Sequence, residues 1–141
     1  MKGWLLDTNI LSEIRRITPQ QAVVAFIAKQ PLDRLFVSTV TLAEIRFGIE
    51  LVDDPVRRAE LNTWLEHKIR PMFEGRTLPV SEDIIFKWRV LVEDGRKSGV
   101  TFSQPDLFIA ATGLHHDLTI VTRNTRDFER THASLLNPWI P

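Results

Sequence analysis

Three acidic residues stand where a carboxylate is unusual in a folded chain: Asp7, Glu44 and Asp106. Asp7 ends an apolar run, Glu44 lies on the apolar side of a helical pattern, and Asp106 opens an almost entirely apolar helix. Like charges about 5 Å apart repel by roughly 3 kcal/mol per pair at an effective dielectric of about 20. If the fold gathers these acids, a positive group must lie among them, and a divalent metal held by oxygen atoms is the natural candidate.

Asp7 and Asp106 each have an ordinary structural explanation. Asp7 could cap the helix that follows it, and Asp106 follows Pro105 in a first helical turn, where the helix dipole favours an acid. Thr8 and Asn9 offer more capping groups than one helix needs, which favours a functional role for that segment. We expect Asp106 to point toward the end of a sheet, because the rest of its helix carries no charge until its far end.

Glu44 has a more specific competing explanation. The pattern Thr41-x-x-Glu44 matches a capping box, in which the glutamate bonds a backbone amide at the start of a helix. Helical spacing instead puts Glu44 on a face with apolar residues, while the charged residues of the segment fall on another face. The apolar set is Val40, Phe47 and Leu51, and the charged set is Arg46, Glu50 and Asp53. A carboxylate on a mostly apolar face needs a partner, which favours a functional Glu44.

A polar and basic segment at 122–128 follows the last clear apolar run. Its candidate site residues are Thr122, Arg123, Asn124, Arg126 and Asp127. Their place after a strand makes them candidates for orienting a water or contacting a phosphate. Asp127 could equally cap a short helical turn, and the two arginines could be solvated surface charges.

Composition limits the class of protein. The chain has 141 residues, of which 43% are apolar and 26% charged, as expected for one globular domain over 1–141. No apolar stretch is long enough to span a membrane, and there is no signal region or cysteine, which fits a cytoplasmic protein. The formal net charge is zero, so any nucleic-acid contact depends on a local basic surface.

Short apolar runs alternate with helical patterns along the whole chain. Runs typical of strands lie at 3–6, 35–37, 77–80 and 118–121, and 135–136 could add an edge strand. Helices are predicted over 10–16, 19–30, 40–52, 54–69, 81–98 and 105–116, and a loop over 122–127. Such alternation predicts an α/β fold with a parallel sheet of four to five strands covered on both faces. Sites in these sheets form at the carboxyl ends of the strands, where Asp7 and Asn124 fall.

Four segments together resemble the PIN-domain ribonucleases, most closely the VapC and FitB type of bacterial toxin. They are LDTN at 6–9, AEI at 43–45, PDLFIAA at 105–111 and VTRNTRDF at 121–128. Each motif is weak alone, but the ordered set is specific and covers nearly the whole chain. The resemblance implies a PIN-like three-layer α/β/α sandwich and a metal-dependent endoribonuclease of a toxin–antitoxin pair.

The resemblance also implies roles for particular residues. By motif match, Asp7, Glu44 and Asp106 correspond to the metal-site acids of the family. The family often has a fourth acid in the last loop, where this chain has the neutral Asn124, with Asp127 three residues further on. The resemblance further implies a homodimer, and a cognate antitoxin whose tail fills the active-site groove.

Oxygen ligands without cysteine suit a hard cation, so the expected metal is Mg²⁺, with Mn²⁺ as a substitute. We expect Asp7 and Asp106 to hold the principal ion, and Glu44 to bind it directly or through water and to take a proton from the attacking water. The reaction would be hydrolysis of an RNA phosphodiester. Other side chains would orient waters or contact the substrate: Thr8, Asn9, Thr122, Asn124, and the basic residues Arg15, Arg16, Arg46, Arg123 and Arg126.

Two other functions are compatible with parts of this pattern. A receiver-like magnesium-dependent phosphoryl-transfer domain also places acids after parallel strands, but it needs paired acids early and a lysine late, where this chain has Arg123. A non-catalytic interaction module would instead satisfy the acids with arginines or helix caps and would bind no metal.

Overall fold

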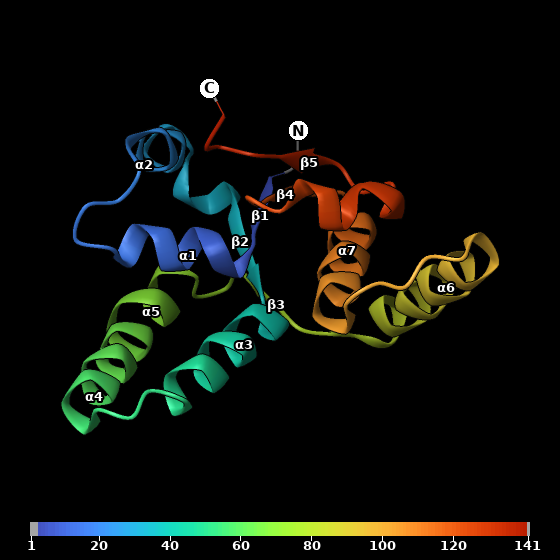
Figure 1. The fold of residues 1–141 in the computed structure, drawn as a ribbon. Helices are drawn as coiled ribbons and strands as arrows, with labels where there is room; N and C mark the ends of the chain where they lie inside the picture. Colours follow the sequence, from blue (N-terminus) through green and yellow to red (C-terminus); the bar gives the residue numbers. More distant parts are fainter. Residues whose placement is uncertain (1–2, 141) are drawn as a thin grey trace.

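The structure, a computed structural model, describes residues 3–140 and is built around a five-stranded sheet (Figure 1). All four strand pairings are parallel, and the strand order is β3-β2-β1-β4-β5. The strands are β1 (Trp4–Leu6), β2 (Leu35–Ser38), β3 (Thr77–Leu78), β4 (Thr119–Val121) and β5 (Leu135–Leu136). The predicted parallel sheet is confirmed, including its edge strand at 135–136.

Helices connect these strands and cover both faces of the sheet (Figure 1). They are α1 (Thr8–Arg15), α2 (Gln21–Lys29), α3 (Thr39–Glu50), α4 (Pro55–Trp64), α5 (Arg70–Met72), α6 (Glu82–Ser98) and α7 (Gln104–His116). Shorter elements are the 3-10 turns Leu32–Arg34 and Thr125–Thr131, and a π-helical segment, Leu65–Ile69, that joins α4 to α5. In the described residues, no helix is both long and apolar enough to cross a membrane.

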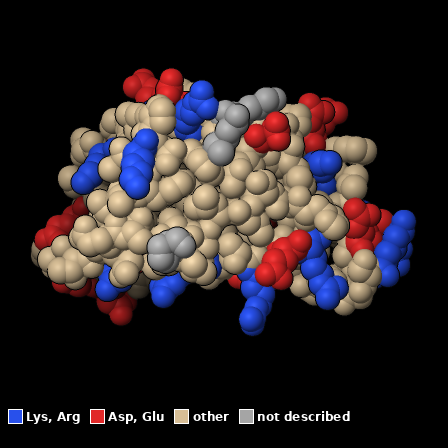
Figure 2. Space-filling model, turned by 90° about the horizontal axis from the view of Figure 1, so that it is seen from above, with Lys and Arg blue, Asp and Glu red and all other residues tan. Residues whose placement is uncertain are grey.

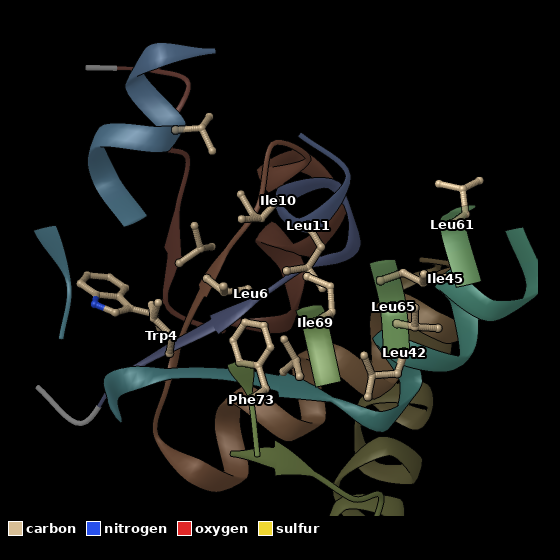
Figure 3. Close-up of a cluster of buried hydrophobic side chains, with 14 of the residues drawn as sticks. Trp4, Leu6, Ile10, Leu11, Leu42, Ile45, Leu61, Leu65, Ile69 and Phe73 are labelled. Carbon is tan, nitrogen blue, oxygen red and sulfur yellow. The ribbon is translucent and has the colours of Figure 1, made fainter. Parts of the chain in front are cut away.

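Alternation along β1 divides the core into two layers. Trp4 and Leu6 point to one face and pack with residues of α1 to α5, while Leu5 points to the other face and packs with residues of α6 and α7. Figure 3 shows the first layer, in which Leu6 lies near Ile69 and Phe73. The three-layer α/β/α arrangement predicted from the sequence is therefore confirmed.

Helix α7 lies close against the sheet because its inner face is made of small residues. Ala110 and Ala111 are fully buried, and a Cβ atom at Gly113 would lie 3.0 Å from Cγ1 of Ile120 in β4. This close packing fixes the start of α7, and with it Asp106, near the carboxyl end of the sheet.

The carboxyl ends of β1 and β4 meet at the point where the strand order reverses. The chain leaves β1 toward β2 on one side, and β4 returns on the other side. Leu6 pairs with Val121, and the Asp7 amide donates to the Val121 carbonyl at 3.0 Å. Asp7 and Thr122 are therefore neighbours at this switch point, which is where parallel sheets form their sites.

The start of α3 differs from the capping-box interpretation of Glu44. Ser38 is the N-cap, and its Oγ accepts a hydrogen bond from the Val40 amide at 3.0 Å. Thr41 therefore lies in the first turn of the helix, and its buried hydroxyl has no hydrogen-bond partner among residues 3–140. The cap position is already taken by a serine, so Glu44 has no capping box to complete.

The apolar residues predicted to share a face with Glu44 were expected to be buried, and this expectation is wrong. Phe47 is 63% exposed and Leu51 is 66% exposed, whereas the buried face of α3 carries Ile45 and Ile49. Glu44 itself is exposed. Helical spacing identified the residues that share a face, but it could not tell whether this chain covers that face.

The segment at 122–127 also departs from the predicted loop. A 3-10 helix begins at Thr125, with Asn124 at its N-cap and Asp127 in its first turn. The Asp127 amide donates to the Asn124 carbonyl at 3.0 Å. Tight turns of this kind are common as connectors between regular elements.

Charged side chains of both signs are dispersed over the surface. On the face shown in Figure 2, basic and acidic groups lie around the edge, and uncharged residues occupy the centre. This pattern fits the formal net charge of zero, and it means that attraction for an anion must come from the local arrangement of a few residues.

Candidate functional site

Asp7, Glu44 and Asp106 line a single pocket of about 670 Å³ at the carboxyl end of the sheet. They come from three separate elements: Asp7 is the N-cap of α1, Glu44 lies in α3, and Asp106 lies in the first turn of α7. The fold thus brings acids that are distant in the sequence to one place, and their roles as metal ligands stay predictions.

Hydrogen bonds hold the Asp7 carboxylate on both of its oxygens. Its Oδ1 accepts from the Thr8 amide at 2.8 Å, and its Oδ2 accepts from the Thr122 hydroxyl at 2.9 Å. The Thr122 oxygen in turn accepts from Asn9 Nδ2 at 3.2 Å and from the Asn124 amide at 3.0 Å. A hydroxyl offers one donor and two acceptor positions, so Thr122 uses its full capacity to fix this side of the pocket.

Asn9 extends this network to Arg123. Its Oδ1 accepts from the Arg123 amide at 3.2 Å, while the Arg123 carbonyl accepts from Asn137 Nδ2 at 3.4 Å. The helix-capping interpretation of Asp7 is therefore correct, and the same segment also organises the pocket. The extra polar group at Asn9 has partners beyond its own helix.

Two of the acids are destabilised in their charged form. Burial raises the pKa of Asp7, against the lowering effect of its hydrogen bonds from Thr8 and Thr122. Burial also raises the pKa of Asp106, and the charges of Asp7, Asp127 and Glu44 raise it further, in that order of size. Among residues 3–140, the charged groups that shift these two carboxyls are other acids. This differs from what an interaction module whose acids are neutralised by arginines would show.

The donor set of the pocket fits a hard divalent cation. The available groups are carboxylate oxygens and the amide of Asn124, the ligands that Mg²⁺ prefers. Within residues 3–140, no group of three or more acidic, histidine or cysteine side chains is arranged to hold a metal ion. The residues therefore fit an ion bound by one or two carboxylates and otherwise hydrated, as is usual for Mg²⁺, and they do not fit a preformed cage of three.

The structure separates the predicted substrate-binding residues into two groups. Thr8, Asn9, Arg123 and Asn124 line the main pocket, together with Arg15 and Arg16. Arg126 and Asp127 line a second hollow of about 520 Å³, which shares Ser103 and Asp106 with the first. Arg46 and the fully buried Thr122 line neither hollow. Asp106 thus stands at the boundary between the two hollows.

Sequence reasoning missed Glu13, Thr41 and Trp139 as lining residues of the main pocket. Glu13 is buried, and its Oε2 accepts from the Gln20 amide at 2.8 Å, so it anchors the turn after α1. The spacing of Thr41 from Glu44 could have identified Thr41 as a site residue, but the same spacing matched a helix capping box. Trp139 reaches the pocket only because the chain returns past β5, and no local pattern reveals this.

The strand order excludes the receiver-like interpretation. Receiver-type sheets have the order 2-1-3-4-5, whereas this sheet has β3-β2-β1-β4-β5. The connection from β2 to β3 therefore continues outward from β1 on the same side, which is a different topology.

An all-parallel sheet with acids gathered at its switch point agrees with the family that the sequence resembles. The family model of the PIN domain matches the sequence over residues 4–133, and this chain belongs to the PIN-domain family.

The chain is also similar to curated toxins and ribonucleases over nearly its full length. It is 35% identical over 135 residues to Toxin FitB of Neisseria gonorrhoeae, covering 96% of this chain and 97% of that protein. It is 35% identical over 137 residues to a VapC ribonuclease of Sinorhizobium fredii, covering 97% and 98%. The crystal structure of FitAcB from Neisseria gonorrhoeae superposes with a TM-score of 0.92 at 34% identity, covering 98% of this chain and 99% of that chain.

Proposed function

We propose that this chain is an endoribonuclease that hydrolyses RNA phosphodiester bonds with Mg²⁺ or Mn²⁺, and that it is the toxin of a toxin–antitoxin pair. The observation that carries the proposal is the pocket that Asp7, Glu44 and Asp106 share. Burial destabilises the Asp106 carboxylate there, and so do the charges of Asp7, of Asp127 in the adjoining hollow, and of Glu44. Relatives named as VapC ribonuclease and Toxin FitB support the reaction and the biological role.

Asp7 and Asp106 are the residues that would hold the ion. Each carboxylate oxygen has more than one acceptor position, so Asp7 keeps capacity for a ligand while Thr8 and Thr122 fix its orientation. When bound, the ion would acidify a water and offset charge on the phosphate oxygens. Asp106 lines both hollows, so an ion that it holds would lie at their boundary and could contact a phosphate in either hollow.

Glu44 is suited to move the proton. It is exposed on α3 and lines the same pocket, so its carboxylate can accept a proton from the attacking water and pass it to solvent. The water oxygen would form a bond to phosphorus, the bond from phosphorus to the leaving ribose oxygen would break, and that oxygen would take a proton from solvent. Arg15, Arg16 and Arg123, which line the pocket, would hold the flanking phosphates.

The proposed partners are a cognate antitoxin and a second copy of the chain. Solved structures similar to this chain include FitAB bound to a DNA fragment and a member of the VapBC family of toxin–antitoxin systems from Mycobacterium tuberculosis. Exposed apolar residues such as Phe47 on α3, Leu51 directly after α3 and Val56 on α4 supply a surface for association, since exposed apolar surface marks interaction sites. We further propose one domain over 1–141 and a cytoplasmic location.

The nuclease proposal is tested with purified protein and a labelled single-stranded RNA. Cleavage is expected with Mg²⁺ or Mn²⁺ and is expected to stop when EDTA is added. The Asp106→Asn variant, purified in the same way, controls for contaminating nuclease. Absence of cleavage with either metal, or cleavage that persists in EDTA, would overturn the proposal.

A further inference from the structure

We propose that Trp139 and Arg123 form a base-stacking subsite, on which a nucleobase next to the cleaved phosphate lies against the indole ring. This inference rests on the proposed ribonuclease function and adds a residue that determines how the RNA is positioned. Trp139 and Arg123 line the same pocket as Asp7 and Glu44. The guanidinium carbon of Arg123 lies 5.3 Å from the centroid of the Trp139 ring.

The indole of Trp139 is supported on its inner side. Trp139 is partly buried and packs against the core layer that contains Trp4 and Leu6. Its backbone amide donates to Asn137 Oδ1 at 2.9 Å, and Nδ2 of the same asparagine donates to the Arg123 carbonyl. Asn137 therefore ties the backbone of Trp139 to the backbone of Arg123, which holds the two residues next to each other before any ligand binds.

A continuous chain of hydrogen bonds connects this pair to the Asp7 carboxylate. The Arg123 amide donates to Asn9 Oδ1, Asn9 Nδ2 donates to Thr122 Oγ1, and that hydroxyl donates to Asp7 Oδ2. A base stacked on Trp139 would consequently sit at a fixed offset from the hydrolytic centre. Positioning of this kind raises rates, because small displacements of a reacting group are costly.

The chemistry of the pair matches a nucleotide. A nucleobase of any sequence can stack on an aromatic ring, and an arginine beside the ring adds a cation–π contact and a partner for phosphate. Arg15 and Arg16 line the same pocket and supply further positive charge for a backbone. The combination of an aromatic face, arginines and nearby acids suits a phosphodiester that carries a base.

Trp88 provides a matched control within the molecule. Its ring stacks on Phe108 with centroids 4.9 Å apart and planes 10° apart, and its Nε1 donates to Gln104 at 2.8 Å. Arg89 lies 5.7 Å from the Trp88 centroid, so this indole also has an adjacent guanidinium. Trp88 is not among the residues that line the pocket with Trp139.

The test measures the affinity of single-stranded RNA by fluorescence anisotropy, in Ca²⁺ and with gels to check that the RNA stays intact. Trp139→Leu keeps apolar volume but removes the stacking surface, and it is expected to weaken binding about tenfold. Trp139→Phe restores a ring and is expected to bind within about threefold of the unaltered protein. Trp88→Leu is expected to bind within about twofold, because its indole lies outside the pocket.

A scan with abasic RNA tests the subsite on the unaltered protein, independently of any folding defect in a variant. Removing the base at one position is expected to weaken binding about tenfold, and that same removal should cost Trp139→Leu little further affinity. The inference is overturned if no abasic position weakens RNA binding. It is also overturned if Trp139→Leu binds RNA with normal affinity and loses only its affinity for an antitoxin peptide. Absence of both RNA binding and cleavage in the unaltered protein would instead defeat the proposed function.

Discussion

The two sides of the pocket are built in different ways. On the Asp7 side, hydrogen bonds run from the carboxylate through Thr122 and Asn9 to Arg123, so the polar groups are positioned before a ligand arrives. On the opposite side, Glu44 is exposed, and Asp106 is destabilised by burial and by the charges of its acidic neighbours. The difference indicates a division of labour: one side supplies geometry, and the other supplies negative charge that a cation would balance.

The largest expected effect comes from neutralising Asp106. The raised pKa means that the native state binds a proton more tightly than the unfolded chain, so ionisation at neutral pH lowers stability. Asp106→Asn is therefore expected to raise the melting temperature in EDTA while reducing RNA cleavage more than about 100-fold. Addition of Mg²⁺ should stabilise the unaltered protein and so reduce the difference in melting temperature between it and Asp106→Asn.

The matched control for this substitution is Asp54→Asn. Asp54 caps α4, and its Oδ1 accepts from the Val56 amide at 3.1 Å. Asparagine caps helices as well as aspartate, so this variant should change neither stability nor cleavage substantially. If Asp106→Asn cleaved RNA normally, or were less stable than the unaltered protein in EDTA, the proposed difference between the two sides of the pocket would be wrong.

The next effect is expected on the hydrogen-bonded side. Thr122→Val keeps the shape of the side chain but leaves Asp7 Oδ2, Asn9 Nδ2 and the Asn124 amide without their partner. We expect a loss of about 1–3 kcal/mol in the free energy of unfolding and a loss of about tenfold to 100-fold in cleavage rate. Chemical unfolding and single-turnover cleavage measure the two effects.

Thr112→Val separates the role of the site from the general cost of removing a buried hydroxyl. Thr112 is fully buried like Thr122, but its hydroxyl donates at 2.7 Å to the Phe108 carbonyl within α7. The Thr112 variant should lose about 1 kcal/mol of stability and keep its cleavage rate. Equal activity losses in both variants would show that the Thr122 network has no special connection to catalysis.

The smallest effect is expected at Glu13, which anchors the turn after α1. The hydrogen bond from the Gln20 amide lowers the pKa of Glu13, and Arg16, whose guanidinium lies 3.3 Å from the carboxylate, lowers it further. A lowered pKa stabilises the fold above the ordinary value of 4.5, and this contribution is lost as the pH falls through the folded-state pKa. Glu13→Gln should therefore be less stable than the unaltered protein at pH 7, with the difference shrinking toward pH 3.

Thermal unfolding across this pH range measures the Glu13 effect. The control is Glu66→Gln, which removes an exposed pair with Arg70 at 2.8 Å and should change stability little, because surface ion pairs contribute little. A stability difference for Glu13→Gln that stays constant with pH would contradict the assignment of Glu13 as a charged anchor.

The sheet was predictable because its determinants are local. Short apolar runs at Trp4–Leu6 and Thr119–Val121 identified the strands. The rule that sites form at the carboxyl ends of parallel strands placed Asp7 and Asn124 at the same edge of the sheet. The ordered motifs then pointed to Glu44 and Asp106, although neither residue is near Asp7 in the sequence.

Other features of the site depend on contacts that no local pattern contains. Phe47 is exposed. The sequence could not predict this exposure, because helical periodicity defines a face without showing what covers it. Trp139 and Glu13 reach the pocket through tertiary packing, so only the folded chain reveals them.

The central claim is that Asp7 and Asp106 together hold a divalent cation in this pocket. Calorimetric titration of the purified protein with Mn²⁺ tests it most directly, by comparing the unaltered protein with Asp106→Asn and Asp54→Asn. We expect measurable Mn²⁺ binding to the unaltered protein, unchanged binding to Asp54→Asn, and binding at least about tenfold weaker for Asp106→Asn. Equal Mn²⁺ affinity in the Asp106→Asn variant, or no binding by the unaltered protein, would contradict it.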